Sequence, residues 1–375
     1  MTDPHRTLEQ LERIPGLTWV DVRTPREHAR GHIPDALSMP VLDDAEHARV
    51  GLCYAQEGAA AAKIVGLSIV GPRLAEVVAR YAELAARGPV ALYCWRGGMR
   101  SGLLGRLLAD LGIPVWILRG GYREHRRRVM AVLEGALPPL IVLHGCTGSG
   151  KTLLLRKLAG ALPVVDLEGL GQHRGSTFGA VGLAPQPAQL QFESELARAF
   201  AAAARDREPP FPVLVEGESP ALGTLKLPPG LIRSMRSGWR LVVELPRPVR
   251  VQILVAEYAP SIQADPACLD RPLEYLAGRL PKAILARLRD ARAAGELEVF
   301  CDLLLEHHYD ALYRRWSRRG EQRDYRTITA SSLPEAEEAV NAAVAEITAL
   351  VREGRRGPFL PPPDPSKPVE VSPES

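Results

Sequence analysis

One cysteine stands in a setting that favours a reactive thiolate. Cys94 follows an apolar run at residues 89–93, which predicts a buried strand, and precedes a helical pattern at residues 101–111. Two glycines and the cations Arg96 and Arg100 lie in the loop that follows the cysteine. Backbone amides at such a turn, together with two guanidinium groups, bind anions and lower the pKa of a thiol. We therefore predict that Cys94 is a nucleophile; the alternative, a buried packing cysteine, would need neither the glycines nor the arginines.

A second stretch fits the phosphate-binding loop pattern at every position. It follows a strand predicted at residues 140–143 and precedes a helix predicted at residues 153–162, which is the context that the motif requires. Its members are Gly145, Cys146, Thr147, Gly148, Ser149, Gly150, Lys151 and Thr152. The glycines let backbone amides surround a phosphate, Lys151 reaches over it, and Thr152 can ligate Mg²⁺. We interpret Cys146 as a packing residue rather than as a second nucleophile.

The acidic partner of this loop has two candidate positions. Asp166 and Glu168 end one predicted strand, and Glu216 and Glu218 end another. Ligands of open parallel sheets bind at the carboxyl ends of strands, so either pair can lie near the phosphates. Solvent-exposed carboxylates after a strand are the alternative for each of them.

Basic side chains gather at three places. His173 and Arg174 lie in a segment bounded by glycines, which favours a loop that approaches a polyanion, with a plain surface turn as the alternative. Residues 123–128 and 314–319 could bind a nucleic-acid backbone, with Trp316 available for base stacking, although a solvated helix face is the usual explanation of such runs. Because the net charge is only +3, nucleic-acid binding would depend on these local patches.

Alternating strands and helices must hold these residues, and they predict an α/β chain with parallel sheets covered on both faces. Further strands are expected at residues 17–23, 114–118 and 241–245, whereas residues 272–319 and 333–352 look wholly helical. Two consecutive prolines mark a boundary near residue 138. We expect domains at residues 1–136 and 137–270, a helical region at 271–359 packed on the second domain, and a disordered tail at 360–375.

The composition is that of a protein with hydrophobic cores and no membrane span. The 375 residues are 46% hydrophobic and 24% charged, and the first 16 are polar, so we expect neither a secretion signal nor a membrane partner. The five cysteines show neither metal-site nor disulfide spacing. We therefore expect a reducing compartment, the cytoplasm, and no bound metal site.

Three segments of the N-terminal part resemble a rhodanese domain, the fold that carries sulfur or selenium on a cysteine. They are Asp21-Val22-Arg23, Gly31-His32-Ile33-Pro34 and the Cys94 loop. Five residues separate Cys94 from Arg100, whereas sulfurtransferases of this fold usually have four, and the longer spacing is shared with related cysteine phosphatases. The resemblance implies a rhodanese-like parallel-sheet domain, followed by a P-loop NTPase-like α/β domain with a helical C-terminal part.

A rhodanese-like domain followed directly by a phosphate-binding loop resembles the tRNA 2-selenouridine synthase family. The resemblance extends from about Trp19 to about Trp316, and the family-like segments occur in the same order. Besides the phosphate-binding loop they are residues 50–54, 96–101, 120–122, 166–170 and 173–176.

The resemblance implies a two-step reaction on the wobble uridine in the anticodon loop of tRNA. First, the sulfur of 2-thiouridine takes a geranyl group from geranyl diphosphate, with Lys151 and its loop stabilising the leaving diphosphate. Selenium from selenophosphate then replaces the S-geranyl group. Cys94 either carries the selenium as a perselenide, with Arg96 and Arg100 holding the anion, or assists the exchange. No permanently bound cofactor is implied, Mg²⁺ can take part, and we expect a monomer.

Two other functions fit parts of the same pattern. The five-residue spacing after Cys94 also suits a cysteine phosphatase fused to a P-loop kinase-like domain. A non-catalytic, ATP-dependent regulator that uses the rhodanese-like domain for binding is the other alternative.

Overall fold

The computed structural model describes residues 3–159, 162–205, 208, 210–317, 325–355 and 357, with only the backbone at 314–317. The chain divides into two units, one of residues 1–135 with 187–198 and the other of residues 136–186 with 199–375. The expected N-terminal domain omitted residues 187–198, because their helical pattern carries no sign of the unit on which they pack. The proposed tail at 360–375 lies outside the described residues.

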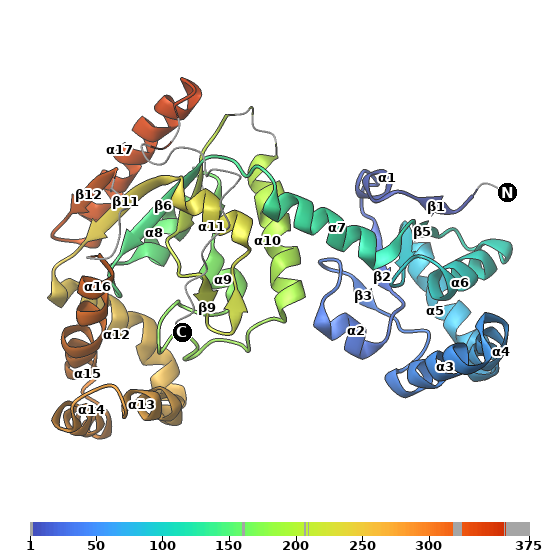
Figure 1. Cartoon of the computed structure of the whole chain (residues 1–375), viewed down its shortest axis with the longest axis horizontal. Coiled ribbons are helices and arrows are strands. Elements are labelled where there is room, and N and C mark those ends of the chain that lie inside the picture. Colours follow the sequence, from blue (N-terminus) through green and yellow to red (C-terminus); the bar gives the residue numbers. More distant parts are fainter. Residues whose placement is uncertain are drawn as a thin grey trace. The chain divides into compact units, whose positions relative to one another are not determined.

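The N-terminal unit is built on a five-stranded parallel sheet in the order β1-β5-β4-β2-β3 (Figure 1). Its strands are β1 (His5–Arg6), β2 (Thr18–Asp21), β3 (Leu37–Ser38), β4 (Val90–Tyr93) and β5 (Trp116–Leu118). Its helices are α1 (Leu8–Glu12), α2 (Pro25–Arg30), α3 (Asp44–Glu57), α4 (Ala59–Val70), α5 (Leu74–Arg87), α6 (Met99–Asp110) and α7 (Gly121–Glu134).

Helices cover both faces of this sheet. Val90 and Leu92 of β4 share a core with Tyr81 of α5 and Leu108 of α6. The alternate residues of β4 share a second core with residues of α1 and α7, Tyr93 among them. Because successive side chains of a strand point to opposite faces, β4 is buried along its whole length, and its carboxyl end carries Cys94.

The second unit holds another five-stranded parallel sheet, in the order β12-β11-β6-β8-β7. The strands are β6 (Leu140–Gly145), β7 (Val164–Val165), β8 (Val213–Glu216), β11 (Trp239–Glu244) and β12 (Arg326–Thr329), and β9 (Ala221–Leu222) forms an antiparallel pair with β10 (Leu225–Lys226). Helices α8 (Lys151–Leu158) and α17 (Leu333–Arg352) pack on one core with β6, β11 and β12. The α/β class expected from the sequence is confirmed.

A group of helices builds a separate apolar core in this unit (Figure 1). Its members are α12 (Arg247–Ala264), α13 (Asp270–Leu276), α14 (Lys282–Ala294) and α15 (Leu297–Leu304). The remaining α-helices are α9 (Leu167–Gly171), α10 (Gln189–Ala204), α11 (Pro229–Arg236) and α16 (Asp310–Ser317), and residues of α10 belong to both units. The region expected to be helical at 271–359 also contributes β12 to the sheet.

Candidate active site

The Cys94 thiol is buried at the carboxyl end of β4, with 4% of the residue exposed. The Ser101 hydroxyl donates a hydrogen bond to Cys94 Sγ at 3.2 Å. Burial alone would raise the pKa of the thiol, but the hydrogen bonds from Ser101, the charge of Arg100 and the Arg96 amide outweigh it, so the pKa lies below its usual value. A thiol in this environment ionises readily to the nucleophilic form.

The two arginines of the loop differ in their surroundings. Arg100 Nη2 donates to Glu27 Oε1 at 3.0 Å, and the Nη1 atom forms an ion pair with the other oxygen of Glu27. The backbone amide of Thr24 also donates to Glu27, within the capping box that begins α2. Arg100 therefore influences Cys94 through its charge, while the Arg96 side chain is exposed.

The start of α7 holds the Cys94 loop in place through backbone hydrogen bonds. The amides of Tyr122 and Arg123 donate to the carbonyl groups of Cys94 and Trp95 at 2.8 and 3.0 Å. Gly121 has a φ of +61°, and a Cβ atom there would lie 2.3 Å from the Cys94 carbonyl oxygen. Only glycine fits this close approach without displacing the loop.

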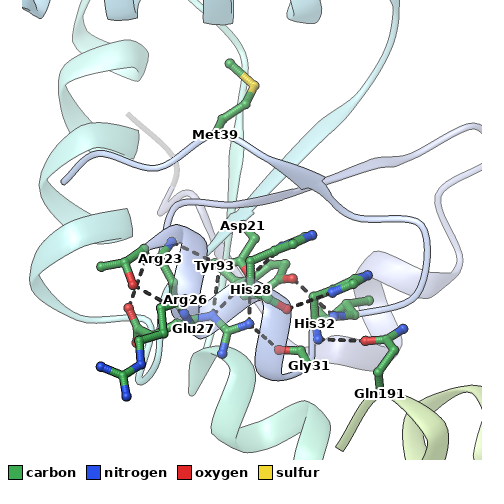
Figure 2. A network of polar contacts seen from close by, with 12 residues as sticks. Asp21, Arg23, Arg26, Glu27, His28, Gly31, His32, Met39, Tyr93 and Gln191 are labelled. Atoms are coloured by element: carbon green, nitrogen blue, oxygen red, sulfur yellow. Dashed lines mark hydrogen bonds and ion pairs between the residues drawn. The ribbon is translucent and has the colours of Figure 1, made fainter. Parts of the chain in front are cut away.

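The Asp21 and Arg23 side chains form a buried ion pair in the same unit (Figure 2). They are 0% and 1% exposed, and Arg23 Nη2 lies 2.6 Å from Asp21 Oδ2 while donating to the Gly31 carbonyl at 2.7 Å. His28 Nδ1 lies 3.2 Å from the same Asp21 oxygen. The network ties β2 to α2, the helix whose Glu27 holds Arg100. These residues position the site rather than enter it.

The phosphate-binding loop connects β6 to α8 in the second unit. Lys151 Nζ donates to the Gly145 carbonyl at 3.0 Å. Arg250 lies in none of the motifs and was not predicted. It donates from Nε and Nη2 to the Thr147 carbonyl at 2.9 and 2.8 Å and pairs with Asp310 at 2.7 Å. These contacts fix the loop from the side of α12.

The structure brings both candidate acidic pairs to this loop. The Thr152 hydroxyl donates to Glu168 Oε2 at 2.6 Å, and the Glu168 amide donates to Glu216 Oε1 at 2.6 Å. Burial and the nearby Asp166 raise the pKa of Glu216 well above its usual value. Burial and the carboxylate of Glu168 raise the pKa of Glu218 in the same way. Near neutral pH, Glu216 and Glu218 therefore retain protons that ordinary carboxyls lose.

The remaining sequence candidates divide between structural and cavity-lining positions. Asp166 caps α9 by accepting from the Gly169 amide at 2.6 Å. Burial raises the pKa of the Cys146 thiol, which suits a packing residue. Arg174 Nε donates to Glu257 at 2.6 Å, and Arg174 lines the cavity described next. The His173 ring packs against Gly179, where an added Cβ atom would lie 2.7 Å from the ring.

A cavity of about 600 Å³ opens at the phosphate-binding loop. Its polar side includes Ser149, whose buried hydroxyl oxygen has no hydrogen-bond partner among the described residues, and Lys151. Aliphatic and aromatic side chains also line the cavity, namely Ile253, Leu254, Tyr258, Tyr309 and Leu312. A small apolar pocket adjoins it through Leu254, Tyr258 and Tyr309 and is lined further by Phe178, Ile262, Leu269, Phe300 and Leu304. No motif marked these apolar side chains, because they come from separate helices.

The basic helix α7 is largely paired with acidic residues of its own unit. Arg126 pairs with Glu193, Arg127 with Glu124, and Arg128 with Glu9 and Glu12. These pairs favour a structural role for this run over a nucleic-acid surface. The side chains of residues 314–319 lie outside the described part of the chain.

The described residues hold no cluster of three or more His, Cys, Asp or Glu side chains that could bind a metal ion by themselves. Within the same residues, no helix combines the length and the apolar character that a membrane crossing requires.

Fold and site together define a rhodanese-like domain joined to a P-loop domain. The rhodanese-like domain profile matches residues 4–127, and the profile described as tRNA 2-selenouridine synthase AAA domain matches residues 138–272. The tRNA 2-selenouridine synthase of Cupriavidus necator is 34% identical over 348 residues, which are 84% of this chain and 91% of that protein. The chain belongs to the tRNA 2-selenouridine synthase family.

Two further relatives with the same name match over a shorter stretch. The protein of Psychromonas ingrahamii is 36% identical over 64% of this chain, and that of Shewanella oneidensis is 38% identical over 65%. The matched stretch spans just under two thirds of each of these relatives, at 64% and 65% of their lengths.

Proposed function

We propose that this chain converts 2-thiouridine at the wobble position of tRNA to 2-selenouridine, through an S-geranyl-2-thiouridine intermediate. Membership of the tRNA 2-selenouridine synthase family supports this function. The enzyme is then a transferase with tRNA as its substrate and with geranyl diphosphate and selenophosphate as co-substrates. We expect it to act as a monomer in the cytoplasm, without a permanently bound cofactor.

The composition of the phosphate-loop cavity carries the proposal for the first step. The cavity of about 600 Å³ is lined both by the phosphate-binding loop and by aliphatic and aromatic side chains, and the adjoining pocket is lined mainly by apolar side chains. A prenyl diphosphate has the same two halves. Its chain of about ten carbons would gain roughly 0.8 kcal/mol for each methylene buried against those side chains.

In this step the sulfur of 2-thiouridine attacks C1 of the geranyl group, and the C1–O bond breaks as diphosphate leaves. Lys151 and the loop amides stabilise the charge that develops on the leaving group. The Thr152 hydroxyl and the Glu168 carboxylate are oxygen ligands of the kind that Mg²⁺ prefers, and they lie 2.6 Å apart. A bound Mg²⁺ would add charge neutralisation to what Lys151 supplies.

We assign the second step to the Cys94 loop. The thiolate of Cys94 attacks the phosphorus of selenophosphate, so that an S–P bond forms as the P–Se bond breaks and selenide leaves. Selenide then attacks C2 of the base, the C2–S bond breaks, and geranylthiolate departs and takes up a proton. Water finally hydrolyses the S–P bond to a thiol and phosphate.

Conservation of oxidation states favours this route over a perselenide on Cys94. Selenium in selenophosphate is already fully reduced, and it stays reduced when a thiolate attacks phosphorus. Joining that selenium to the Cys94 sulfur would require an oxidant. The five-residue spacing between Cys94 and Arg100, shared with cysteine phosphatases, suits attack on phosphorus.

Two substitutions test whether geranylation occurs at the phosphate-binding loop and selenium transfer at the Cys94 loop. With purified protein, tRNA and both co-substrates, Cys94→Ala should abolish 2-selenouridine and leave S-geranyl-2-thiouridine to accumulate. Lys151→Ala should slow geranylation by about 10²-fold or more, the usual cost of a lost transition-state contact. Mass spectrometry of the tRNA nucleosides measures both results.

Formation of 2-selenouridine by Cys94→Ala, or normal geranylation by Lys151→Ala, would contradict these assignments. The route through phosphorus has its own test, since selenophosphate with labelled phosphorus should label Cys94 whereas labelled selenium should not. A cysteine phosphatase remains the second candidate because of the same spacing. It would form phosphocysteine from an aryl phosphate and deliver no selenium to tRNA.

A further inference from the structure

An apolar groove opens beside the Cys94 loop in the N-terminal unit. Its volume is about 380 Å³, and small-molecule sites span roughly 300–1,000 Å³. Residues of α3, α4, α5 and α6 line it, mostly with leucine and valine side chains. The apolar members include Val50, Leu67, Val70, Leu74, Met99 and Leu103.

The groove and the thiol share the first turn of α6. Met99 and Arg100 line the groove, and the next residue, Ser101, donates its hydroxyl hydrogen to Cys94 Sγ at 3.2 Å. Leu104 lines the groove and also belongs to the core cluster that contains Cys94. A molecule in the groove would therefore lie against the turn that holds the reactive sulfur.

Several apolar side chains of the groove are accessible to solvent. Leu67 on α4 is 65% exposed, Leu103 on α6 is 56% exposed, and Met99 is 42% exposed. Contiguous exposed apolar side chains of this kind mark binding sites on soluble proteins. The lining also contains Lys63, and such a cation suits an occupant that is attached to an RNA backbone.

We propose that this groove binds the geranyl chain of S-geranyl-2-thiouridine while C2 of the same base reacts at Cys94. The proposal rests on the proposed function, which assigns the second step to that thiol. The geranyl chain is joined to C2 through one sulfur atom, so a base that reacts at Cys94 brings its chain to the immediate surroundings of the thiol. Moving each methylene from water into an aliphatic groove favours binding.

The size of the groove favours a short aliphatic chain over a protein partner. A stable protein interface buries roughly 800 Å² on each partner, which is a wide and nearly flat area. A groove of about 380 Å³ between neighbouring helices is instead on the scale of a small ligand. The chain would thus have two prenyl sites, one at the phosphate-binding loop for the donor and one at Cys94 for the modified base.

The test varies two things: the length of the alkyl chain on the substrate sulfur, and the presence of charged side chains in the groove. The substrates are anticodon stem-loops that carry either S-geranyl- or S-methyl-2-thiouridine, supplied with selenophosphate, and the product is 2-selenouridine. The groove variant combines Leu67→Glu with Leu103→Glu. The control combines Ile64→Glu with Leu111→Glu, at positions that are 70% and 56% exposed and outside the groove lining.

We expect the wild-type and control proteins to prefer the S-geranyl substrate by about tenfold or more in kcat/KM. In the groove variant this preference should fall towards one, through a higher KM for the S-geranyl substrate, while the S-methyl reaction is unchanged. Because both replaced leucines are exposed, the variant should stay folded, which circular dichroism checks.

A preference that is intact in the groove variant, or lost equally in the control, would overturn the proposal. So would an intact preference together with a changed oligomeric state in sedimentation, because the groove would then bind a protein. If the wild-type protein makes no 2-selenouridine from either substrate, the proposed function itself fails, and this outcome is distinct from an intact preference.

Discussion

At the scale of single residues, Cys94 differs from Cys301 and Cys146 because of its hydrogen bonds. Burial raises the pKa of Cys301 to about 12, and it also raises the pKa of Cys146. Cys94 is buried as well, yet its pKa is lowered, since Ser101 and the charge of Arg100 stabilise the thiolate. The lowered pKa of Cys94 therefore depends on two neighbours on the first turn of α6, Arg100 and Ser101.

Ser101→Ala should raise the pKa of Cys94, because it removes the hydroxyl that donates to the sulfur at 3.2 Å while burial remains. A thiol with a raised pKa needs a higher pH to ionise, so the pH profile of its alkylation should move to higher pH. Iodoacetamide labelling, followed on the Cys94 peptide by mass spectrometry, measures this profile. Ser68→Ala, at an exposed position on α4, is the control, and an unshifted profile in Ser101→Ala would contradict the argument.

At the scale of elements, the loop after β4 depends on the start of α7. The two segments are far apart in sequence, but the Tyr122 amide donates to the Cys94 carbonyl and Gly121 packs against the same oxygen. The family-like segment at residues 120–122 thus acts as a support for the thiol loop.

Gly121→Ala should destabilise the N-terminal unit by about 3 kcal/mol or more, because a Cβ atom would both strain a φ of +61° and lie 2.3 Å from a backbone oxygen. Gly112→Ala is the matched control: its φ is +78° with nothing within 4 Å of the added Cβ atom, so it should cost only about 1 kcal/mol. Denaturant unfolding measures both. Equal losses of unfolding free energy in the two variants would show that the close packing of Gly121 against the Cys94 carbonyl does not contribute to stability.

The strands that lead into the two candidate sites could be predicted from sequence, whereas several peripheral elements could not. Apolar runs before Cys94 and Gly145 mark β4 and β6, because parallel strands are buried on both faces. The hairpin of α3 and α4 escaped prediction, since its exposed apolar residues blur the usual helical pattern. The strand β12 was missed because only its pairing with β11 defines it.

The same difference applies to the candidate site. The phosphate-binding loop is contiguous in sequence, so its members were identified together. Arg250 and the apolar wall of Tyr258 and Tyr309 come from distant helices, and only the folded chain brings them to that loop.

At the scale of the whole molecule, the two candidate reaction sites lie in separate units of one chain. The P-loop unit supplies a cavity suited to a prenyl diphosphate, and the rhodanese-like unit supplies a thiol with a lowered pKa beside an aliphatic groove. In the proposed sequence the product of the first site is the substrate of the second. If both assignments hold, one chain carries out the complete exchange of sulfur for selenium.

The most direct test is mass spectrometry of the nucleosides of tRNA from cells with and without this protein, grown with selenium. We predict that 2-selenouridine is present only when the protein is present and that 2-thiouridine accumulates in its absence. Restoring the Cys94→Ala protein to the deletion strain should give S-geranyl-2-thiouridine instead. An unchanged set of tRNA nucleosides after deletion would contradict the proposed function.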